Sequence, residues 1–324
     1  MRALVTALIA SLLLCGGAQP GAAESYPARP IYIVVPSAPG GVTDLLARSL
    51  AVRLTQAWGQ QVIIENKPGA NNQIGAEFVA KAAPDGYTLL VAPETTFVVN
   101  PTLYGKLLYD PDKDFAPVAG LAFVQQALVV NPSLPAKSVA ELIGLARTKP
   151  GELAYACAGI GSASHLNMEL FQAKAQVKFL AVHYRGATPA LTDVIAGHVP
   201  MMFVNIGSTL EAFRAGRVKL LAIGSGERLP EFPDLPTVAE SGVPGFEARS
   251  WFGLFAPSRT PAQIIAKLNG EVHRIFADPE YRQNVLAPNT LQPIASSPEQ
   301  YAALIRADAE KWGKLIRDAN IKGD

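Results

Sequence analysis

The sequence contains little cysteine and histidine, the residue types that form disulfides and many metal sites. Its 324 residues include two cysteines and four histidines. Cys157 is the one cysteine outside the N-terminal apolar stretch, so no internal disulfide forms and stability depends on a hydrophobic core. We expect Cys157 to be a small buried hydrophobe. Because the histidines have no metal-ligand spacing, we expect neither a metal nor a cofactor.

The sequence also lacks an excess of charge of either sign. The formal net charge is +1 and no basic run is present, which argues against a nucleic-acid partner. Hydrophobic residues make up 49% and charged residues 17%. This is a globular composition, because a disordered chain has less apolar and more charged content. The length is sufficient for two ordinary domains or one large one.

No apolar run after the N-terminus is long enough to span a membrane. The N-terminus itself has Arg2, then apolar residues 3–14, then small residues up to Ala23, which is the pattern of a signal peptide. We expect residues 1–23 to be removed and the protein to be periplasmic. A lipid anchor at Cys15 is the alternative, but Leu14 stands where a small residue is needed.

Motifs typical of enzymes are absent. We find no Gly-x-Ser-x-Gly, no His-Glu-x-x-His and no P-loop. Ser162 and Ser164 lie near His165, but neighbours in the first turn of one helix do not face each other as nucleophile and base. Their plainer role is to cap that helix. We therefore predict that the protein is not an enzyme, with a secreted α/β enzyme acting on a small carboxylate as the alternative.

Strand and helix patterns alternate along the first hundred residues. Apolar, β-branched runs predict strands at 31–35, 62–66 and 87–91, and helical spacing predicts helices at 42–58 and 73–83. This order indicates a parallel sheet covered by helices on both faces.

The alternation then repeats in a second block. Strands are predicted at 126–130, 152–158, 177–184, 199–205 and 218–224. A capping box predicts a helix after Ser138, and Thr188 followed by Pro189 predicts another.

After residue 245 the pattern indicates one more strand, 249–258, and two late helices capped at Thr260 and Ser297. We expect the late helices to cover the first block. Domain 1 is then discontinuous, 24–125 plus 250–324, and domain 2 is 126–249. Two segments cross between them, and a cleft separates them.

Three glycine-containing turns share one design, a strand followed by the start of a helix. They are "PSAPGG" (36–41), "KPGANNQIG" (67–75) and "AGIGSASH" (158–165). Ligands bind at the carboxyl ends of parallel strands, and backbone N–H groups at a helix start hold anions. A turn without lysine suits a carboxylate better than a triphosphate. The alternative is that these glycines serve only turn geometry.

With these features in order, the chain resembles the solute-binding proteins of the tripartite tricarboxylate transporter type, the Bug or TctC-like family. The resemblance covers essentially the whole mature chain. The segments that carry it include "YPARPIYIVVPSAPGGVTDLLAR", "VIIENKPGANNQIGAEFVAKAAPDGYTLL", "NPTLY", "GSASHL", "VHYRGATPALTDVIAGHV", "RAGRVKLLAI" and "LPTVAESGVPGFEARSWFGLFAP".

The resemblance implies an α/β, two-domain periplasmic-binding-protein (Venus-flytrap) fold. Each domain would be a mixed, mostly parallel sheet flanked by helices, with the ligand cleft between the domains. It also implies that small carboxylates are bound mainly through backbone amides and ordered waters. The implied ligand-binding residues are Pro36, Ser37, Ala38, Gly40, Gly41, Thr43, Asp44, Gly69, Ala70, Asn71, Asn72, Thr95, Thr96, Ser162, Ser164, His165, Tyr184, Arg185, Gly186, Asn205, Trp251 and Phe252.

Some positions depart from the family pattern or leave a choice open. Val204 stands where members often have aspartate, which argues against an amino-acid ligand and for a dicarboxylate, or an aromatic or heterocyclic acid. Arg185 either pairs with a distal carboxylate or is structural. Trp251 either packs in the protein or stacks on the ligand.

The function that the resemblance implies is capture of a small organic carboxylate, such as a di- or tricarboxylate, by domain closure. A monomeric protein would deliver this ligand to the membrane components of a tripartite tricarboxylate transporter. A ligand-sensing partner of a membrane receptor is an alternative that the sequence does not separate from transport.

Overall fold

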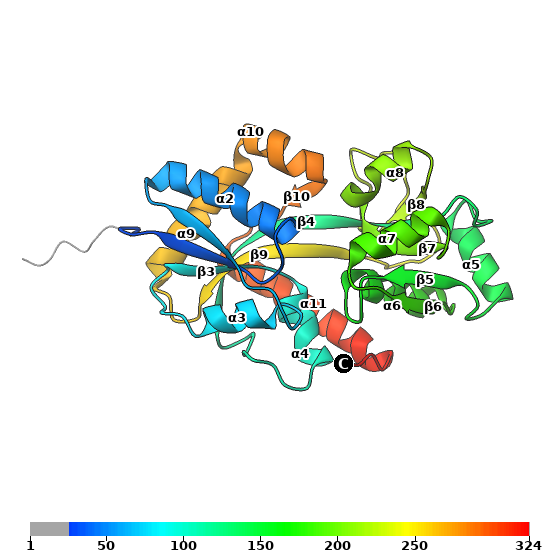
Figure 1. The fold of residues 1–324 in the computed structure, drawn as a ribbon, viewed down its shortest axis with the longest axis horizontal. Helices are drawn as coiled ribbons and strands as arrows, with labels where there is room; N and C mark the ends of the chain where they lie inside the picture. The colour runs from blue at the N-terminus through cyan, green and yellow to red at the C-terminus, as the bar shows by residue number, and fades with distance from the viewer. Residues whose placement is uncertain (1–25, 324) are drawn as a thin grey trace, which may run out of the picture.

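Two lobes, joined by long strands, make up the computed structural model, which describes residues 26–323 (Figure 1). The predicted signal peptide and Cys15 lie outside the described residues. The joining strands are β4 (Phe115–Val130) and β9 (Arg249–Pro257). Through Gln125, β4 pairs with β9, and from Gln126 onward it pairs with strands of the other lobe. One strand therefore belongs to both lobes.

The sheet of the first lobe has the strand order β10-β4-β9-β3-β1-β2. The remaining strands are β1 (Ile31–Val35), β2 (Val62–Asn66), β3 (Thr88–Pro93) and β10 (Leu291–Pro293). β1 is parallel to β2 and β3, whereas β9 is antiparallel to β3 and β4. The sheet is mixed, as expected, but the two connecting strands make it less parallel than predicted.

The first-lobe helices follow the predicted apolar spacing. α2 (Val42–Trp58) buries Leu46, Leu50 and Leu54 against the sheet. Ser297 and Gln300 form the predicted capping box at the start of the last long helix. The helical segments of this part are α2, α3 (Gln73–Ala80), η1 (Thr95–Val99), α4 (Asn100–Leu103), α9 (Ala262–Ala277), α10 (Pro279–Tyr281), η3 (Arg282–Leu286), η4 (Ala287–Asn289) and α11 (Pro298–Asp318).

The second lobe extends the far end of β4. β7 (Met201–Asn205) and β8 (Lys219–Ile223) pair antiparallel with its two edges. β5 (Ala154–Cys157) and β6 (Leu180–His183) form a separate parallel pair. The helical segments here are α5 (Val139–Thr148), α6 (Ala163–Ala175), α7 (Ala187–Ala196), η2 (Ile206–Thr209) and α8 (Leu210–Arg214).

Two local predictions were wrong, and a third was incomplete. The run 126–130 is only the end of the 16-residue β4. α7 begins before Thr188, because Gly186, with φ 123°, provides the turn into the helix. Thr260 does not cap α9, which begins after Pro261, and its Oγ1 is buried without a partner among the described residues.

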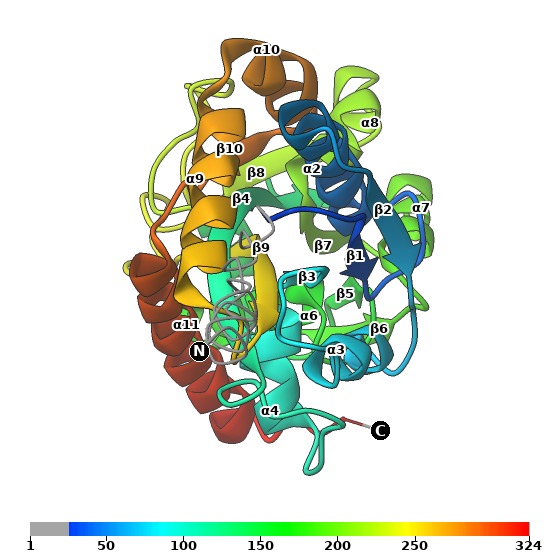
Figure 2. The same cartoon turned by 90° about the vertical axis from the view of Figure 1, so that its left-hand side faces the viewer.

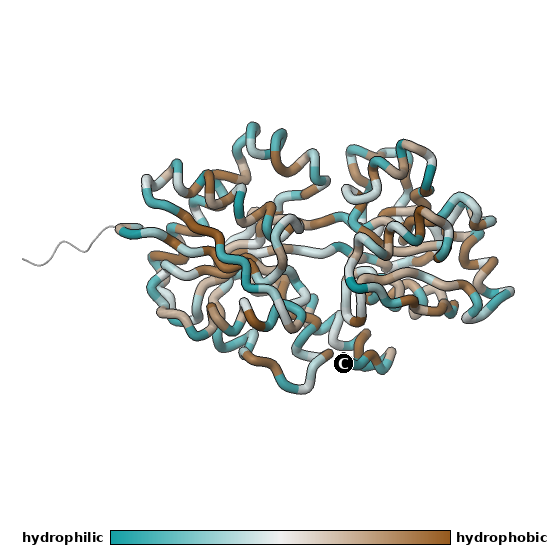
Figure 3. Tube along the Cα trace, viewed as in Figure 1, coloured by the Kyte–Doolittle hydropathy of each residue, from teal (hydrophilic) through white to brown (hydrophobic). Residues whose placement is uncertain are grey.

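A continuous hydrophobic core reaches from one lobe into the other. It joins Phe97 of η1 and Trp312 of α11 to Phe171 of α6. Hydrophobic segments occupy the interior of both lobes (Figure 3), and α11 lies on the opposite side of the first lobe from β2 (Figure 2). α11 contacts η1, β4 and α6, so it bridges the lobes alongside the two strands. Among residues 26–323, no helix has the length and apolarity to cross a membrane.

Candidate functional site

Three turns meet at one edge of the first-lobe sheet. β1, β2 and β3 run parallel, so the segments after them, 36–41, 67–72 and 94–96, lie at the same edge. The first two turns pack against each other, because a Cβ on Gly75 would lie 2.8 Å from Pro36 Cα. Glycine at position 75 therefore permits this close approach.

Asp44 braces the first turn from behind. Its Oδ2 accepts hydrogen bonds from Gly40 N at 3.0 Å and Arg48 Nε at 2.8 Å, and its Oδ1 accepts one from Asn66 Nδ2 at 2.9 Å. The hydrogen bond from Arg48, with those from Asn66 and Gly40, lowers the pKa of Asp44 to about 2 although burial opposes this. Both carboxylate oxygens are thus committed within the protein, and Thr43 beside it is buried as well.

The front of the same turn is open. Ala38, Gly40 and Gly41 are exposed, and Ser37 is half-buried. The N–H groups of Ser37, Ala38 and Gly41 make no hydrogen bond to another described residue. They precede α2, whose first N–H groups also have no partner within the helix, so this turn can receive an anion.

The second turn has an uncommon backbone conformation. Gly69 has φ 134°, and Ala70, Asn71 and Asn72 follow with φ of 46°, 49° and 74°. Three consecutive left-handed residues with side chains are costly, and such strain concentrates at ligand sites. The N–H groups of Asn71 and Asn72 make no bond to any described residue, and α3 begins directly after them.

The third segment is the π-helical η1. Thr95 is half-buried, and its Oγ1 accepts a 3.4 Å hydrogen bond from Asn72 Nδ2. Thr96 is fully buried, and its Oγ1 has no partner among the described residues. Thr95 is therefore the better placed of the two predicted threonines to meet a ligand.

In the second lobe, Ser162, Ser164 and His165 form a closed turn. Ser162 Oγ donates to Gly159 O at 2.7 Å and lies 3.0 Å from Ser164 Oγ. Ser162 also caps α6, accepting from His165 N at 3.3 Å. In the described chain, no ring nitrogen of His165 bonds to either hydroxyl, so this is a cap rather than a nucleophile–base pair.

His165 is held as a neutral ring. Its Nδ1 accepts from Gly161 N at 3.2 Å, and burial, with His183 nearby, lowers the pKa of His165 to about 4. Cys157 lies beside this pair, with its Sγ 3.1 Å from His183 Nδ1. Cys157 is buried as expected, and this burial raises the pKa of its thiol to about 11.

The remaining second-lobe residues follow β6 and β7. Tyr184 is half-buried and its OH donates to Asp193 Oδ2 at 2.7 Å, while Asn205 Oδ1 accepts from Gly207 N at 2.9 Å. Arg185 is exposed and forms no ion pair with another residue in the range 26–323. Arg185 is thus available to a distal carboxylate, one of the two roles that the sequence left open.

Trp251 and Val204 face the interior. Trp251 is fully buried: its ring lies 5.3 Å from that of Tyr301, and its Nε1 donates to Asp308 Oδ2 at 2.7 Å. This leaves no surface of the Trp251 ring for a ligand, whereas Phe252 is half-buried. Val204 is 4% exposed within the apolar core of the second lobe, so its side chain gives no direct argument about ligand choice.

Several polar residues that brace these turns were not predicted. Asn66 donates to Ser37 O at 3.1 Å as well as to Asp44. Glu94 and Asn100 are buried directly before and after η1. The segment "NPTLY", which begins at Asn100, was the sequence signal for the last of these, but its spacing gave no indication of a contact with the second turn.

A cavity of about 970 Å³ lies away from these turns. Residues near the ends of α5, α6 and α11, including Arg147, Gln172 and Leu315, line it. None of the predicted binding residues lines it, so it is not the candidate site.

Comparison with known proteins gives a consistent result. A sequence model described as "Tripartite tricarboxylate transporter family receptor" matches residues 46–321. The chain is 35% identical over 323 residues to Protein BugT of Bordetella pertussis, covering 99% of each. A structure of R. palustris Rpa4515 with adipate has 37% identity and a TM-score of 0.82, covering 92% of this chain and 99% of that one. MatC (Rpa3494) from Rhodopseudomonas palustris with bound malate has 36% identity and a TM-score of 0.77, covering 90% and 100%.

Proposed function

Because this chain belongs to the tripartite tricarboxylate transporter receptor family, which includes the Bug solute-binding proteins, we propose that it binds a small dicarboxylate between its lobes. The fold is that of the two-domain periplasmic binding proteins. Adipate and malate, the ligands in the two related structures named above, support this choice of ligand class.

The observation that supports this proposal most is the pair of adjacent turns at 36–41 and 69–72. Both present N–H groups that are not bonded to described residues, and both lead into helix N-termini, whose partial positive charge favours an anion. One carboxylate is proposed to lie there. The turn of Ser162 to His165 and the segment Tyr184 to Gly186 are proposed to approach the other end of the ligand.

Ligand capture then follows from lobe closure. We assign 24–125 plus 250–324 to one domain and 126–249 to the other, with β4 and β9 crossing between them. A ligand that touches both domains only in the closed form shifts the population toward that form. The closed monomer is proposed to be the form that a membrane transporter accepts.

The test is thermal unfolding of the mature protein with adipate, malate, amino acids and adipamide, the neutral analogue of adipate. A ligand at a hundred times its Kd stabilises the folded state by about 2.7 kcal/mol, which raises Tm by several degrees. We expect adipate or malate to raise Tm and adipamide to have no effect. Equal shifts with adipamide would contradict a carboxylate site, and consumption of a compound, followed by NMR, would indicate an enzyme instead.

A further inference from the structure

We propose that Asn100 is the positioning residue for the second turn, 69–72, and that carboxylate affinity depends on it. This inference rests on the proposed function. Asn100 is fully buried at the start of α4, between the candidate site and the core. Its side-chain amide contacts Asn71 of the turn, and it acts on the site through that residue.

Two reciprocal hydrogen bonds join these asparagines. Asn100 Nδ2 donates to Asn71 O at 2.8 Å, and Asn71 Nδ2 donates to Asn100 Oδ1 at 2.8 Å. The Asn100 amide therefore uses both its donor and its acceptor on one residue of the turn. A side chain without both functions cannot replace it.

The turn needs such an anchor because of its backbone. Ala70, Asn71 and Asn72 all have positive φ, a conformation that is unfavourable for residues with a side chain, and more so for alanine than for asparagine. Within the turn, Gln73 N bonds to Ala70 O. Strained backbone persists only where the surroundings hold it, and the Asn100 bonds to Asn71 are the main polar contact from outside the turn.

Asn100 is in turn held by its own surroundings. Its Nδ2 lies 3.4 Å from the OH of Tyr109, and that OH donates to Thr96 O. The turn is thereby linked to η1 through buried groups. Hydrogen bonds in such a buried network are costly to leave unsatisfied, so the loss of Asn100 should release the turn.

Four variants test this inference. Asn100→Leu keeps the number and branching of the side-chain heavy atoms and removes both bonds. Asn100→Asp keeps the shape and the acceptor, and regains a donor only when protonated. Asn71→Ala leaves the bond to the backbone carbonyl. Asn131→Asp is the matched control, because Asn131 is a buried asparagine in the second lobe that donates to Val194 O at 2.8 Å.

The readouts are the Kd for adipate by calorimetry and amide hydrogen exchange of residues 69–76 without ligand. We expect Asn100→Leu to weaken binding at least tenfold and to speed exchange in 69–76, with a smaller effect of Asn71→Ala. The affinity of Asn100→Asp, expressed relative to wild type at each pH, should recover as pH falls from about 8 to 5.5. A residue that only fills space would not produce this pH dependence. Asn131→Asp should leave Kd unchanged.

Wild-type affinity and exchange in folded Asn100→Leu would overturn the inference. If Asn100→Leu does not fold, Asn100→Asp decides the question. An affinity of Asn100→Asp that does not change with pH, together with wild-type amide exchange in 69–76, would overturn the inference equally. If wild type binds no acid in the panel, the proposed function fails, and exchange still decides whether Asn100 holds the turn. Faster exchange in the variant then supports its positioning role, and unchanged exchange refutes it.

Discussion

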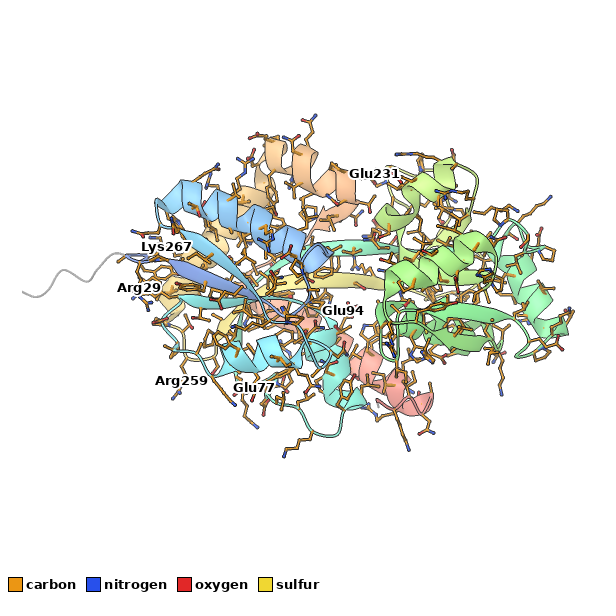
Figure 4. The ribbon with its side chains drawn as sticks, viewed as in Figure 1. Arg29, Glu77, Glu94, Glu231, Arg259 and Lys267 are labelled. Atoms are coloured by element: carbon orange, nitrogen blue, oxygen red, sulfur yellow. The ribbon has the colours of Figure 1, made fainter. Side chains whose placement is uncertain are left out.

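Glu94 and Trp251 are joined by two hydrogen bonds at the point where β9 enters the first lobe. Glu94 N donates to Trp251 O at 2.9 Å, and Trp251 N donates to Glu94 Oε2 at 3.1 Å. Figure 4 shows Glu94 near the boundary between the lobes, far from Arg29 and Lys267 at the outer end. The Trp251 indole in turn donates a hydrogen bond to Asp308 of α11. A buried carboxyl thus connects η1, a crossing strand and the bridging helix.

Replacing Glu94 by glutamine should reduce the loss of stability at rising pH. Burial, and then the neighbouring Asp308 carboxyl, raises the pKa of Glu94 to about 8, although Ser250, Trp251 and Lys311 oppose this. The folded state therefore keeps a proton that the unfolded chain releases, so stability is complete below about pH 4.5 and falls between there and about pH 8. Because the pKa rises from 4.5 to about 8, the fall should be on the order of 5 kcal/mol.

Tm measured from pH 5 to 8.5 tests this, with the exposed Glu310→Gln on α11 as the control. Asp308, whose pKa burial also raises, contributes a slope of the same sign. Glu94→Gln should flatten the profile and Glu310→Gln should not. Identical profiles for wild type and Glu94→Gln would show that Glu94 does not titrate in this range.

His165→Gln should reduce the loss of folding stability at acidic pH. Because burial lowers the pKa of His165 to about 4, the folded state favours the neutral ring, and stability is lost as pH falls from about 6.5 to 4. Glutamine is uncharged and retains an acceptor for Gly161 N. We expect this variant to lose less stability than wild type between pH 6.5 and 4, measured by urea unfolding. The exposed His198→Gln is the control, and an equal loss in wild type and His165→Gln would contradict the prediction.

Local sequence patterns predicted the elements whose stability is local. The bounds of β1, β2 and α2 follow from apolar runs and helical spacing, and Ser297 caps α11 because capping involves only nearby residues. The first part of β4 was missed because its partner β9 lies more than a hundred residues further along the chain, and Pro117 and Gly120 interrupt its pattern.

The candidate site likewise combines features set by nearby residues, which were predicted, with features set by distant residues, which were not. The turns themselves were predicted from their glycines, and the structure brings 36–41 and 67–72 side by side. The residues that brace the turns, such as Asn66 and Asn100, were not predicted. A polar residue becomes a brace only through a tertiary contact, and no spacing rule reports that contact. Burial of Trp251 and Val204 likewise depends on neighbours distant in sequence.

Gly41→Val should abolish carboxylate binding and preserve the fold. Gly41 has φ −84° and ψ 176°, an extended conformation that valine adopts readily, and a Cβ there would meet nothing within 4 Å. The added side chain would then occupy the space in front of the N–H groups. We expect at least a tenfold loss of adipate affinity with Tm changed by no more than a few degrees.

Gly270→Val on α9 is the matched control, since Gly270 also has open space around it. Gly40 is a poorer choice because its φ of 91° would strain any valine. Unchanged affinity in folded Gly41→Val would refute binding at the first turn.

Asp44→Asn should weaken ligand binding through the shape of the turn rather than through charge. Donors face both carboxylate oxygens of Asp44: Gly40 N and Arg48 Nε donate to Oδ2, and Asn66 Nδ2 donates to Oδ1. The NH2 group of asparagine must face one of these sets of donors, so at least one bond is lost at a cost of about 1–3 kcal/mol. If only the negative charge mattered, its removal beside an anion site would strengthen binding.

Arg48→Gln separates these explanations, because it breaks the ion pair, in which the Arg48 side chain is 52% exposed, and leaves the bonds of Asp44 to Gly40 and Asn66 in place. An exposed pair contributes little to stability. In calorimetric titrations with adipate, Asp44→Asn should bind several-fold more weakly and Arg48→Gln should remain close to wild type. Equal losses in the two variants would mean that the ion pair, and not the brace on the turn, sets the affinity.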